Sequence, residues 1–252
     1  VKVGHTGTLD PFASGLLVVL VGRATRLARF MSGADKTYEA DVRLGVVSDT
    51  GDPDGGLTPT GAPLPDVDAV ERAVASFRGA QRQRVPALAA VKVDGERLYR
   101  RTRRGETPEL PEREVTIHEI SLRSGPAEDG TVPLRVRCSA GTYIRRLATD
   151  LGEALGCGAY CAALRRTAVG GLPLEGAVAP EEVRREDPGD LRAALAHLPS
   201  TSLTPAQFED ARHGRPIEGG PEGTTSLWFD DRLVAIAEGR ADGTLHPKVV
   251  LT

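Results

Sequence analysis

Hydrophobic and polar positions alternate along much of the chain with the two-residue period of β-strands. Residues 37–44 place four apolar side chains, from Tyr38 to Leu44, on one side and charged ones on the other, which predicts a strand with one buried face. The continuous apolar run at residues 16–21 predicts a fully buried strand. Further strands are predicted at residues 89–93, 115–122, 134–140 and 162–169.

Other segments follow the helical period. In residues 142–155, apolar side chains recur three and four positions apart from Ile144 to Leu155, and Gly156 follows as a stop signal. Asp66 is a suitable N-cap for a helix that ends before Gly79. Two more helices are predicted at residues 23–30 and 97–104. These elements predict an α+β fold around a mixed, mainly antiparallel central sheet flanked by helices.

The pattern changes near residue 177. Residues 180–198 read as helical stretches and residues 205–213 as a short segment. Small strands are predicted at residues 226–229, 233–238 and 248–251. We therefore expect a main domain over residues 1–199 and a small β-rich module over residues 200–252.

The composition is that of a globular protein. The 252 residues are 40% hydrophobic and 27% charged, which supports one sizeable core. No apolar stretch approaches the roughly 20 residues that span a bilayer, and no secretion signal opens the chain. We expect a cytoplasmic monomer whose three cysteines are free thiols in a reducing compartment: Cys138, Cys157 and Cys161.

The net charge of −3 conceals an asymmetry along the chain. Residues 1–176 hold 24 basic and 22 acidic side chains, whereas the rest holds 8 and 13. Nine bases and two acids lie between Arg78 and Arg104. Such a cluster is either a solvated face or a site for phosphates, and charge alone leaves both open.

The opening loop, "GHTGTLDP", ends in Asp10. It is not a P-loop, because a Gly-Lys-Ser/Thr ending is missing and a carboxylate would repel a phosphate. One interpretation is a turn capped by its own polar side chains. The other is a lone carboxylate held at a strand entrance for nucleophilic or general-base work.

Two other stretches carry candidate chemistry. The acidic loop at residues 49–55 lacks the glutamate and flanking helices of a calcium site, so we predict an acidic surface turn and no metal. In "GTYIRR", Arg145 stands near the start of a predicted helix, close to its core face. There it is either a partner for a carboxylate or an ordinary solvated side chain.

Together, these stretches resemble the TruB family of pseudouridine synthases, which convert uridine 55 in the T loop of tRNA to pseudouridine. The resemblance implies the pseudouridine synthase fold with a short PUA-like C-terminal module. Relatives usually begin with a further strand and a Lys-Pro loop, which this sequence lacks. The matching blocks, in family order, are "GHTGTLDPFASGLLVVLVGRATR", "DKTYEADVRLGVVSDTGDPDG", "FRGAQRQRVPALAAVKVDGERLYRRTRRGE", "CSAGTYIRRLATDLGEALGCGAY" and "LRRTAVG".

The resemblance also assigns residues to roles. Asp10 matches the catalytic aspartate, Arg145 the arginine paired with it, and Tyr38 the tyrosine that packs on the target base. The remaining substrate-binding candidates are His5, Tyr143, Leu164, Arg101 and Arg104. The reaction oxidises nothing and loses no group, so no cofactor is expected, and tRNA is the expected partner. Two alternatives stay open: an RNA-binding protein of this fold without catalysis, and a nucleoside or glycoside hydrolase using Asp10.

Overall fold

The computed structural model describes the chain except for residues 88, 90, 91, 94, 105, 107, 108, 185–188 and 252. The chain forms two compact units. We call residues 9–16 and 35–167 the sheet unit, and residues 1–8, 17–34 and 168 onward the terminal unit. The expected boundary between residues 199 and 200 stays a prediction.

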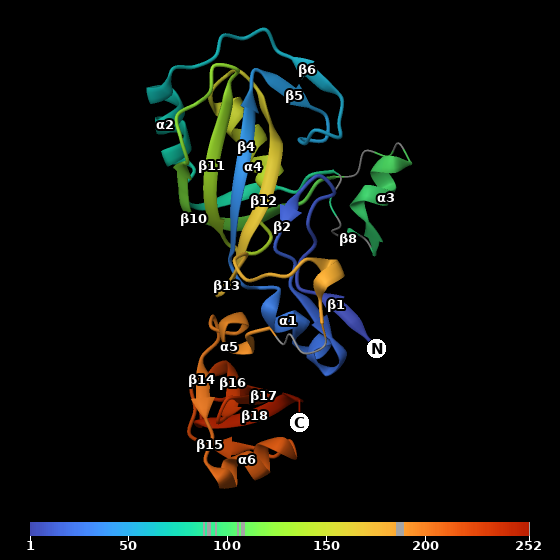
Figure 1. The fold of residues 1–252 in the computed structure, drawn as a ribbon, viewed down its shortest axis with the longest axis vertical. Coiled ribbons are helices and arrows are strands. Elements are labelled where there is room, and N and C mark those ends of the chain that lie inside the picture. The colour runs from blue at the N-terminus through green and yellow to red at the C-terminus, as the bar shows by residue number, and fades with distance from the viewer. Residues whose placement is uncertain are drawn as a thin grey trace. The chain divides into compact units, whose positions relative to one another are not determined.

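Among the described residues, the main sheet has seven strands in the order β13-β12-β4-β11-β10-β7, with β2 beside β12 (Figure 1). The pairs β4–β11, β11–β10 and β10–β7 are antiparallel, whereas β2 joins β12 in parallel. This confirms the mixed, mainly antiparallel sheet. The strands are β2 (Ser14–Gly15), β4 (Lys36–Leu44), β7 (Gly79–Arg84), β10 (Glu112–Leu122), β11 (Thr131–Cys138), β12 (Ala159–Val169) and β13 (Leu172–Pro173).

Two helices complete the core of the sheet unit. Helix α4 (Ile144–Ala154) buries its predicted apolar face in the same core as the inward side chains of β4 and β11. Helix α2 (Val67–Ser76) packs beside β10 (Figure 1), and the Asp66 carboxylate caps it by accepting a hydrogen bond from the Ala69 amide. Both helices confirm the periodicity argument, since burial of one stripe stabilises an amphipathic helix.

The residues between these elements form smaller structures. Strands β5 (Val46–Ser48) and β6 (Leu57–Pro59) form an antiparallel hairpin that carries the acidic loop of residues 49–55 between them. Strands β8 (Lys92–Val93) and β9 (Glu96–Arg97) precede helix α3 (Leu98–Arg103). The prediction of a helix near residues 97–104 is thus confirmed, while the predicted strand at 89–93 lies partly outside the described residues.

The N-terminal part of the terminal unit corrects one prediction. Strands β1 (Val3–His5) and β3 (Val19–Val21) form an antiparallel pair, followed by a 3₁₀-helix η1 (Gly22–Leu27) and α1 (Ala28–Met31). The run at residues 16–21 is not a fully buried strand. Only one face of this ribbon packs inward, so Leu20 is 5% exposed but Val19 and Val21 are 49% and 56% exposed.

A five-stranded sheet, in the order β14-β16-β17-β18-β15 among the described residues, forms the C-terminal part of the terminal unit (Figure 1). Helix α6 (Pro205–Arg212) packs against it and begins with a capping box between Thr204 and Gln207. Within the described residues of the predicted helical stretch at 180–198, the helices are η2 (Pro180–Glu182) and α5 (Leu191–Ala194). The strands are β14 (Ser200–Ser202), β15 (Ile217–Glu218), β16 (Gly223–Phe229), β17 (Arg232–Gly239) and β18 (Thr244–Val250).

No helix among the described residues has the length and apolar character that crossing a membrane requires.

Candidate active site

Asp10 and Arg145 form a bidentate ion pair in the sheet unit. Arg145 Nε donates to Oδ2 of Asp10 and Nη2 donates to Oδ1, each at 3.1 Å. The Arg145 side chain is 3% exposed and that of Asp10 is 29% exposed. A two-point pair fixes both the position and the plane of a carboxylate. Arg145 is therefore not the solvated side chain that the sequence left open.

The loop that carries Asp10 is anchored on its C-terminal side. A turn closes directly after it, with the Ala13 amide donating to the Asp10 carbonyl at 2.9 Å, and Phe12 packs against the core of the sheet unit. Beyond the loop, the Leu16 amide donates to the Arg166 carbonyl at 2.8 Å, and Arg166 Nε returns a hydrogen bond of 2.8 Å to the Leu16 carbonyl. Asp10 thus stands on a short, fixed segment.

Asp52, which stands in the predicted acidic surface turn, belongs to the same network and was not among the predicted site residues. The Asp52 side chain is 7% exposed, and its Oδ2 accepts a hydrogen bond of 3.0 Å from Arg145 Nη1. Its Oδ1 accepts from the Thr50 hydroxyl at 2.6 Å and from the Asp54 amide at 3.1 Å. The surface-turn prediction is wrong here because Arg145, 93 residues away, supplies the charge that allows a carboxylate to be buried. No periodic signal marks such a distant partner.

Tyr38 lies on β4 near this pair. Burial raises the pKa of its phenol to about 12, the Cys138 and Asp10 charges add to the rise, and a hydrogen bond and the positive charge from Arg166 oppose it. Arg166 is itself buried, at 2% exposure. The phenol is therefore neutral at physiological pH and has a fixed cationic neighbour.

Tyr143 is the residue directly before α4. The Arg113 guanidinium lies over its ring, 5.4 Å from the centroid, and the ring packs against the apolar cluster of Val85, Ala89 and Leu98. Burial raises the pKa of Tyr143, and the charges of Asp10 and Arg145 also act on it. The ring is thus within electrostatic reach of the ion pair.

The other predicted substrate-binding residues lie on β12, on β1 and in the basic segment. Leu164 is 7% exposed on β12, in the core of the sheet unit. His5 is exposed on β1, in the terminal unit. In the basic segment, Arg104 pairs with Glu96 and Glu106 through four hydrogen bonds of 2.6–3.0 Å, and Arg101 pairs with Glu106 at 2.9 Å.

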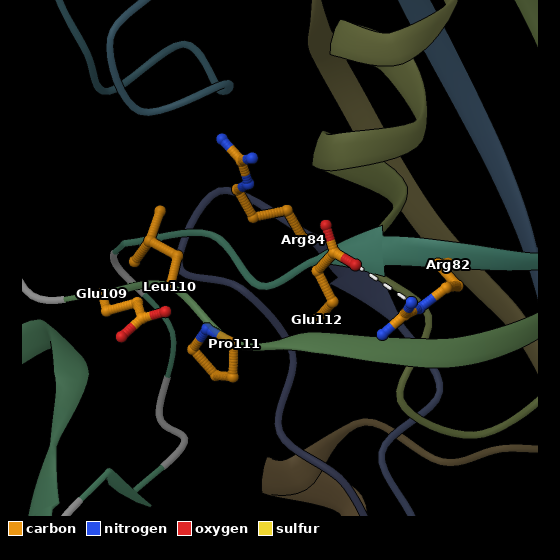
Figure 2. A pocket seen from close by; sticks show the side chains of 6 residues that line it. All are labelled: Arg82, Arg84, Glu109, Leu110, Pro111 and Glu112. Carbon is orange, nitrogen blue, oxygen red and sulfur yellow. Dashed lines mark ion pairs between the residues drawn. The ribbon is translucent and has the colours of Figure 1, made fainter.

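A cavity of about 550 Å³ lies where β7 ends and β10 begins. Figure 2 shows Arg82 and Arg84 on β7 and Glu112 on β10, with an ion pair of 3.4 Å between Arg82 and Glu112. The other lining residues are Glu109, Leu110 and Pro111. Its two arginines and two glutamates balance, so its charge favours neither anions nor cations. None of the predicted site residues lines it.

Within the described residues, no three His, Cys, Asp or Glu side chains gather closely enough to hold a metal ion. The chemistry that the geometry supports is that of one oriented, partly exposed carboxylate beside two aromatic side chains.

Comparison with solved structures identifies the class of fold. The chain matches a Cbf5-Nop10-Gar1 complex with a TM-score of 0.73 at 24% identity, covering 100% of this chain and 76% of the other. It also matches an H/ACA RNP bound to a substrate RNA containing 2′-deoxyuridine, with a TM-score of 0.71 at 22% identity and coverage of 100% and 77%. At these identities the comparison establishes a shared fold.

Comparison with sequences identifies the family. Residues 1–144 match the model of the TruB family pseudouridylate synthase N-terminal domain, and residues 145–198 match that of the tRNA pseudouridylate synthase B C-terminal domain. A tRNA pseudouridine synthase B from Synechococcus sp. (strain WH7803) is 42% identical, over 99% of this chain and 88% of that protein. One from Thermobifida fusca (strain YX) is also 42% identical, with the same coverage. The chain belongs to the TruB family of pseudouridylate synthases.

Proposed function

We propose that this chain isomerises uridine 55 in the T loop of tRNA to pseudouridine, with Asp10 as the catalytic carboxylate. The observation that carries the proposal is the bidentate pair between buried Arg145 and partly exposed Asp10. Membership of the TruB family supports the reaction, and the names of the relatives support tRNA as the substrate. We also propose that the protein acts as a monomer in the cytoplasm.

The reaction breaks the N1–C1′ bond, turns the uracil and joins C5 to C1′. The proton that leaves C5 is balanced by one taken up at N1, so the product is an isomer and no oxidant or cosubstrate enters. A carboxylate serves such a reaction by attacking C1′ or by removing a proton from C2′. In both routes the Asp10 carboxylate must be aimed at the sugar, and the two fixed hydrogen bonds from Arg145 orient it.

The uracil must stay in place while it turns. An aromatic face suits this task because it contacts the base in any in-plane orientation, at about 1–3 kcal/mol per stacked base. Tyr38 and Tyr143 are the candidates for this contact, since the charge of Asp10 reaches both phenols. Leu164 would supply an apolar wall, and His5 a contact with RNA around the flipped nucleotide.

The substrate uridine must leave its stack, which costs a few kcal/mol. Contacts to phosphates offset such a cost, and the segment from Arg78 to Arg104 is rich in the arginines that make them. Arg101 and Arg104 are the proposed contacts. Their present partners, Glu96 and Glu106, would have to release them.

The test is release of tritium from T-loop RNA labelled at C5 of uridine, because the reaction loses that hydrogen. We expect the wild-type chain to release it and Asp10→Asn to lose about 10²–10⁴-fold in rate while still binding RNA. Asp41→Asn, on the outward face of β4, is the matched control and should keep the wild-type rate. Release by Asp10→Asn at the wild-type rate would refute the assignment.

A further inference from the structure

Gln83 is the polar side chain most deeply buried on strand β7. It is 1% exposed, whereas its neighbours Arg82 and Arg84 point to the opposite, exposed face and line the cavity of Figure 2. A buried amide needs partners for both its donor and its acceptor, because a buried polar group without a hydrogen bond keeps the full cost of its desolvation. Its partners therefore indicate what it does.

Both ends of the Gln83 amide bind the backbone of one residue, Tyr143. Gln83 Oε1 accepts from the Tyr143 amide at 2.7 Å, and Nε2 donates to the Tyr143 carbonyl at 3.0 Å. The two residues are 60 positions apart. The side chain thus pairs with Tyr143 as a neighbouring strand would, and it fixes both the position and the direction of that peptide segment.

Tyr143 is the N-cap of α4, and its own side chain makes no capping hydrogen bond. Its carbonyl also accepts the first bond of the helix, from the Leu147 amide at 3.0 Å. Arg145 is the second residue of that helix. Any shift of the first turn would therefore move the guanidinium relative to Asp10, and a misplacement of about 1 Å in an active site costs as much as about 10²-fold in rate.

Strand β10 supplies a second contact to the same residue. Arg113 is the cross-strand partner of Gln83 in the β10–β7 register, and its guanidinium lies over the Tyr143 ring. One cross-strand pair thus holds the Tyr143 backbone through Gln83 and its ring through Arg113. The pair defines both the start of α4 and the orientation of an aromatic side chain beside the ion pair.

We propose that Gln83 is a positioning residue for the isomerisation: its side-chain amide clamps the Tyr143 backbone and thereby aims Arg145 at Asp10. This inference rests on the proposed function, in which Asp10 is catalytic. Glutamine has the required chemistry because it carries a donor and an acceptor at the right reach. Leucine at this position offers neither, and an ionised glutamate offers acceptors alone, one of them facing the Tyr143 carbonyl.

The test compares Gln83→Leu and Gln83→Glu with the same changes at Gln81. Gln81 is the next position on the same face of β7; it is half-buried, and its amide binds the Phe77 carbonyl away from the site. We expect both Gln83 variants to lose about 10–100-fold in kcat for tritium release near pH 8, with KM and the Kd for RNA within about threefold. The Gln81 variants should keep kcat within about twofold.

The pH profile distinguishes positioning from a general loss of stability. A protonated glutamate regains an O–H donor for the Tyr143 carbonyl, and burial favours that neutral form. The kcat of Gln83→Glu relative to wild type should therefore rise at least threefold from pH 8 to pH 5.5, while that of Gln83→Leu stays flat. If Gln83→Leu does not fold, Gln83→Glu and its pH profile decide the matter.

Folded Gln83 variants with wild-type kcat, or a loss confined to KM, would overturn the inference. So would a relative kcat of Gln83→Glu that does not change with pH. Asp10→Asn in the same assay tests the proposed function separately. If Asp10→Asn is active, the catalytic role of Asp10 is refuted. If Asp10→Asn is inactive but the Gln83 variants have wild-type kcat, only the positioning role of Gln83 is refuted.

Discussion

Arg145 binds two carboxylates that differ in their exposure. The Asp10 side chain is 29% exposed and that of Asp52 is 7% exposed. Only a carboxylate that a substrate can reach can act on it, which favours Asp10 as the reacting group. Asp52 is left to hold the other side of the guanidinium, together with the Thr50 carbonyl at 3.0 Å.

Replacing Asp52 tests this division of roles. In Asp52→Asn, one charge of the buried network is removed while Arg145 keeps Asp10 as a partner. We expect the free energy of unfolding to fall by about 1–3 kcal/mol and kcat to fall by about 10-fold or more, since the guanidinium is no longer held from both sides. Urea unfolding and tritium release measure the two effects. Asp54→Asn, an exposed carboxylate in the same loop, is the control, and equal effects from both variants would contradict the assignment.

The half-buried phenol of Tyr38 predicts a dependence of stability on pH. Its pKa rises from 10.0 to about 12, chiefly through burial, so the folded chain holds this proton more tightly than the unfolded chain. The contribution of Tyr38 is then complete below pH 10 and is lost progressively as pH rises from 10 to 12, by about 1 kcal/mol at pH 11. Cys138 and Cys161, whose pKa values are also raised by burial, act in the same direction.

Tyr38→Phe isolates the contribution of the phenol. We expect the difference in unfolding free energy between wild type and this variant to stay constant from pH 7 to 9 and then to shift against the wild type by about 1 kcal/mol at pH 11. Urea titrations at each pH supply the values. A difference that remains constant through pH 11 would show that Tyr38 is not buried as described.

At the scale of elements, strand β2 fastens the Asp10 loop to β12. The backbones of β2 and β12 lie close together at Gly15. Gly15 has a φ of +101°, and a Cβ added to it would lie 2.3 Å from the Arg166 carbonyl oxygen. Because that oxygen belongs to the backbone of a paired strand, it cannot move aside cheaply. Gly15 is therefore required both by its backbone conformation and by the space it leaves.

We expect Gly15→Ala to lower the free energy of unfolding by about 2–4 kcal/mol and to reduce kcat, because the loop carrying Asp10 must shift. Gly22→Ala is the matched control. Gly22 also has a positive φ, of +62°, but nothing lies within 4 Å of its added Cβ, so it should lose only about 1 kcal/mol and no activity. Thermal unfolding and single-turnover rates measure stability and activity for each variant. Similar losses in Gly15→Ala and Gly22→Ala would show that the loss of stability comes from backbone strain alone and not from the close contact with Arg166.

The sequence predicted the elements whose periodicity expresses burial. Strand β4 and helix α4 appear close to their predicted bounds because each has one apolar face that the core covers. The prediction is wrong for β3: a continuous apolar run predicts burial on both faces, whereas Val19 and Val21 are exposed. A short apolar run does not indicate whether one or both faces of the strand are buried in the core.

Polar residues in the site escaped prediction for a related reason. Asp52 and Gln83 stand in stretches of polar residues that are typical of surfaces. Each is buried by a partner far along the chain, Arg145 or Tyr143. Such pairings exist only after the strands and helices have assembled. Asp10, Arg145 and Tyr38 were found through family blocks, whose order carries information that local spacing lacks.

At the scale of the molecule, a chain of net charge −3 has to bind a polyanion. Binding of nucleic acid depends on local charge, and the basic segment from Arg78 to Arg104 supplies it. In the free protein, Glu96 and Glu106 neutralise Arg104, and Glu106 also pairs with Arg101. Phosphates would replace these carboxylates. The electrostatic free energy gained on binding RNA is therefore the difference between an arginine–phosphate pair and the arginine–carboxylate pair that it replaces.

This exchange predicts how the affinity for RNA varies with salt. Removing one arginine–phosphate pair lowers the slope of log K against log salt concentration by about 0.7–1, so the double change Arg101→Gln and Arg104→Gln should lower it by about 1.5–2 and weaken binding at low salt. Arg43→Gln is the control, because Arg43 is also paired with a carboxylate, Asp129, but lies on β4 outside the basic segment. Filter binding at salt concentrations from about 50 to about 300 mM measures the slopes. An unchanged slope in the double variant would place both arginines in solvent and leave phosphate binding to other residues of the segment.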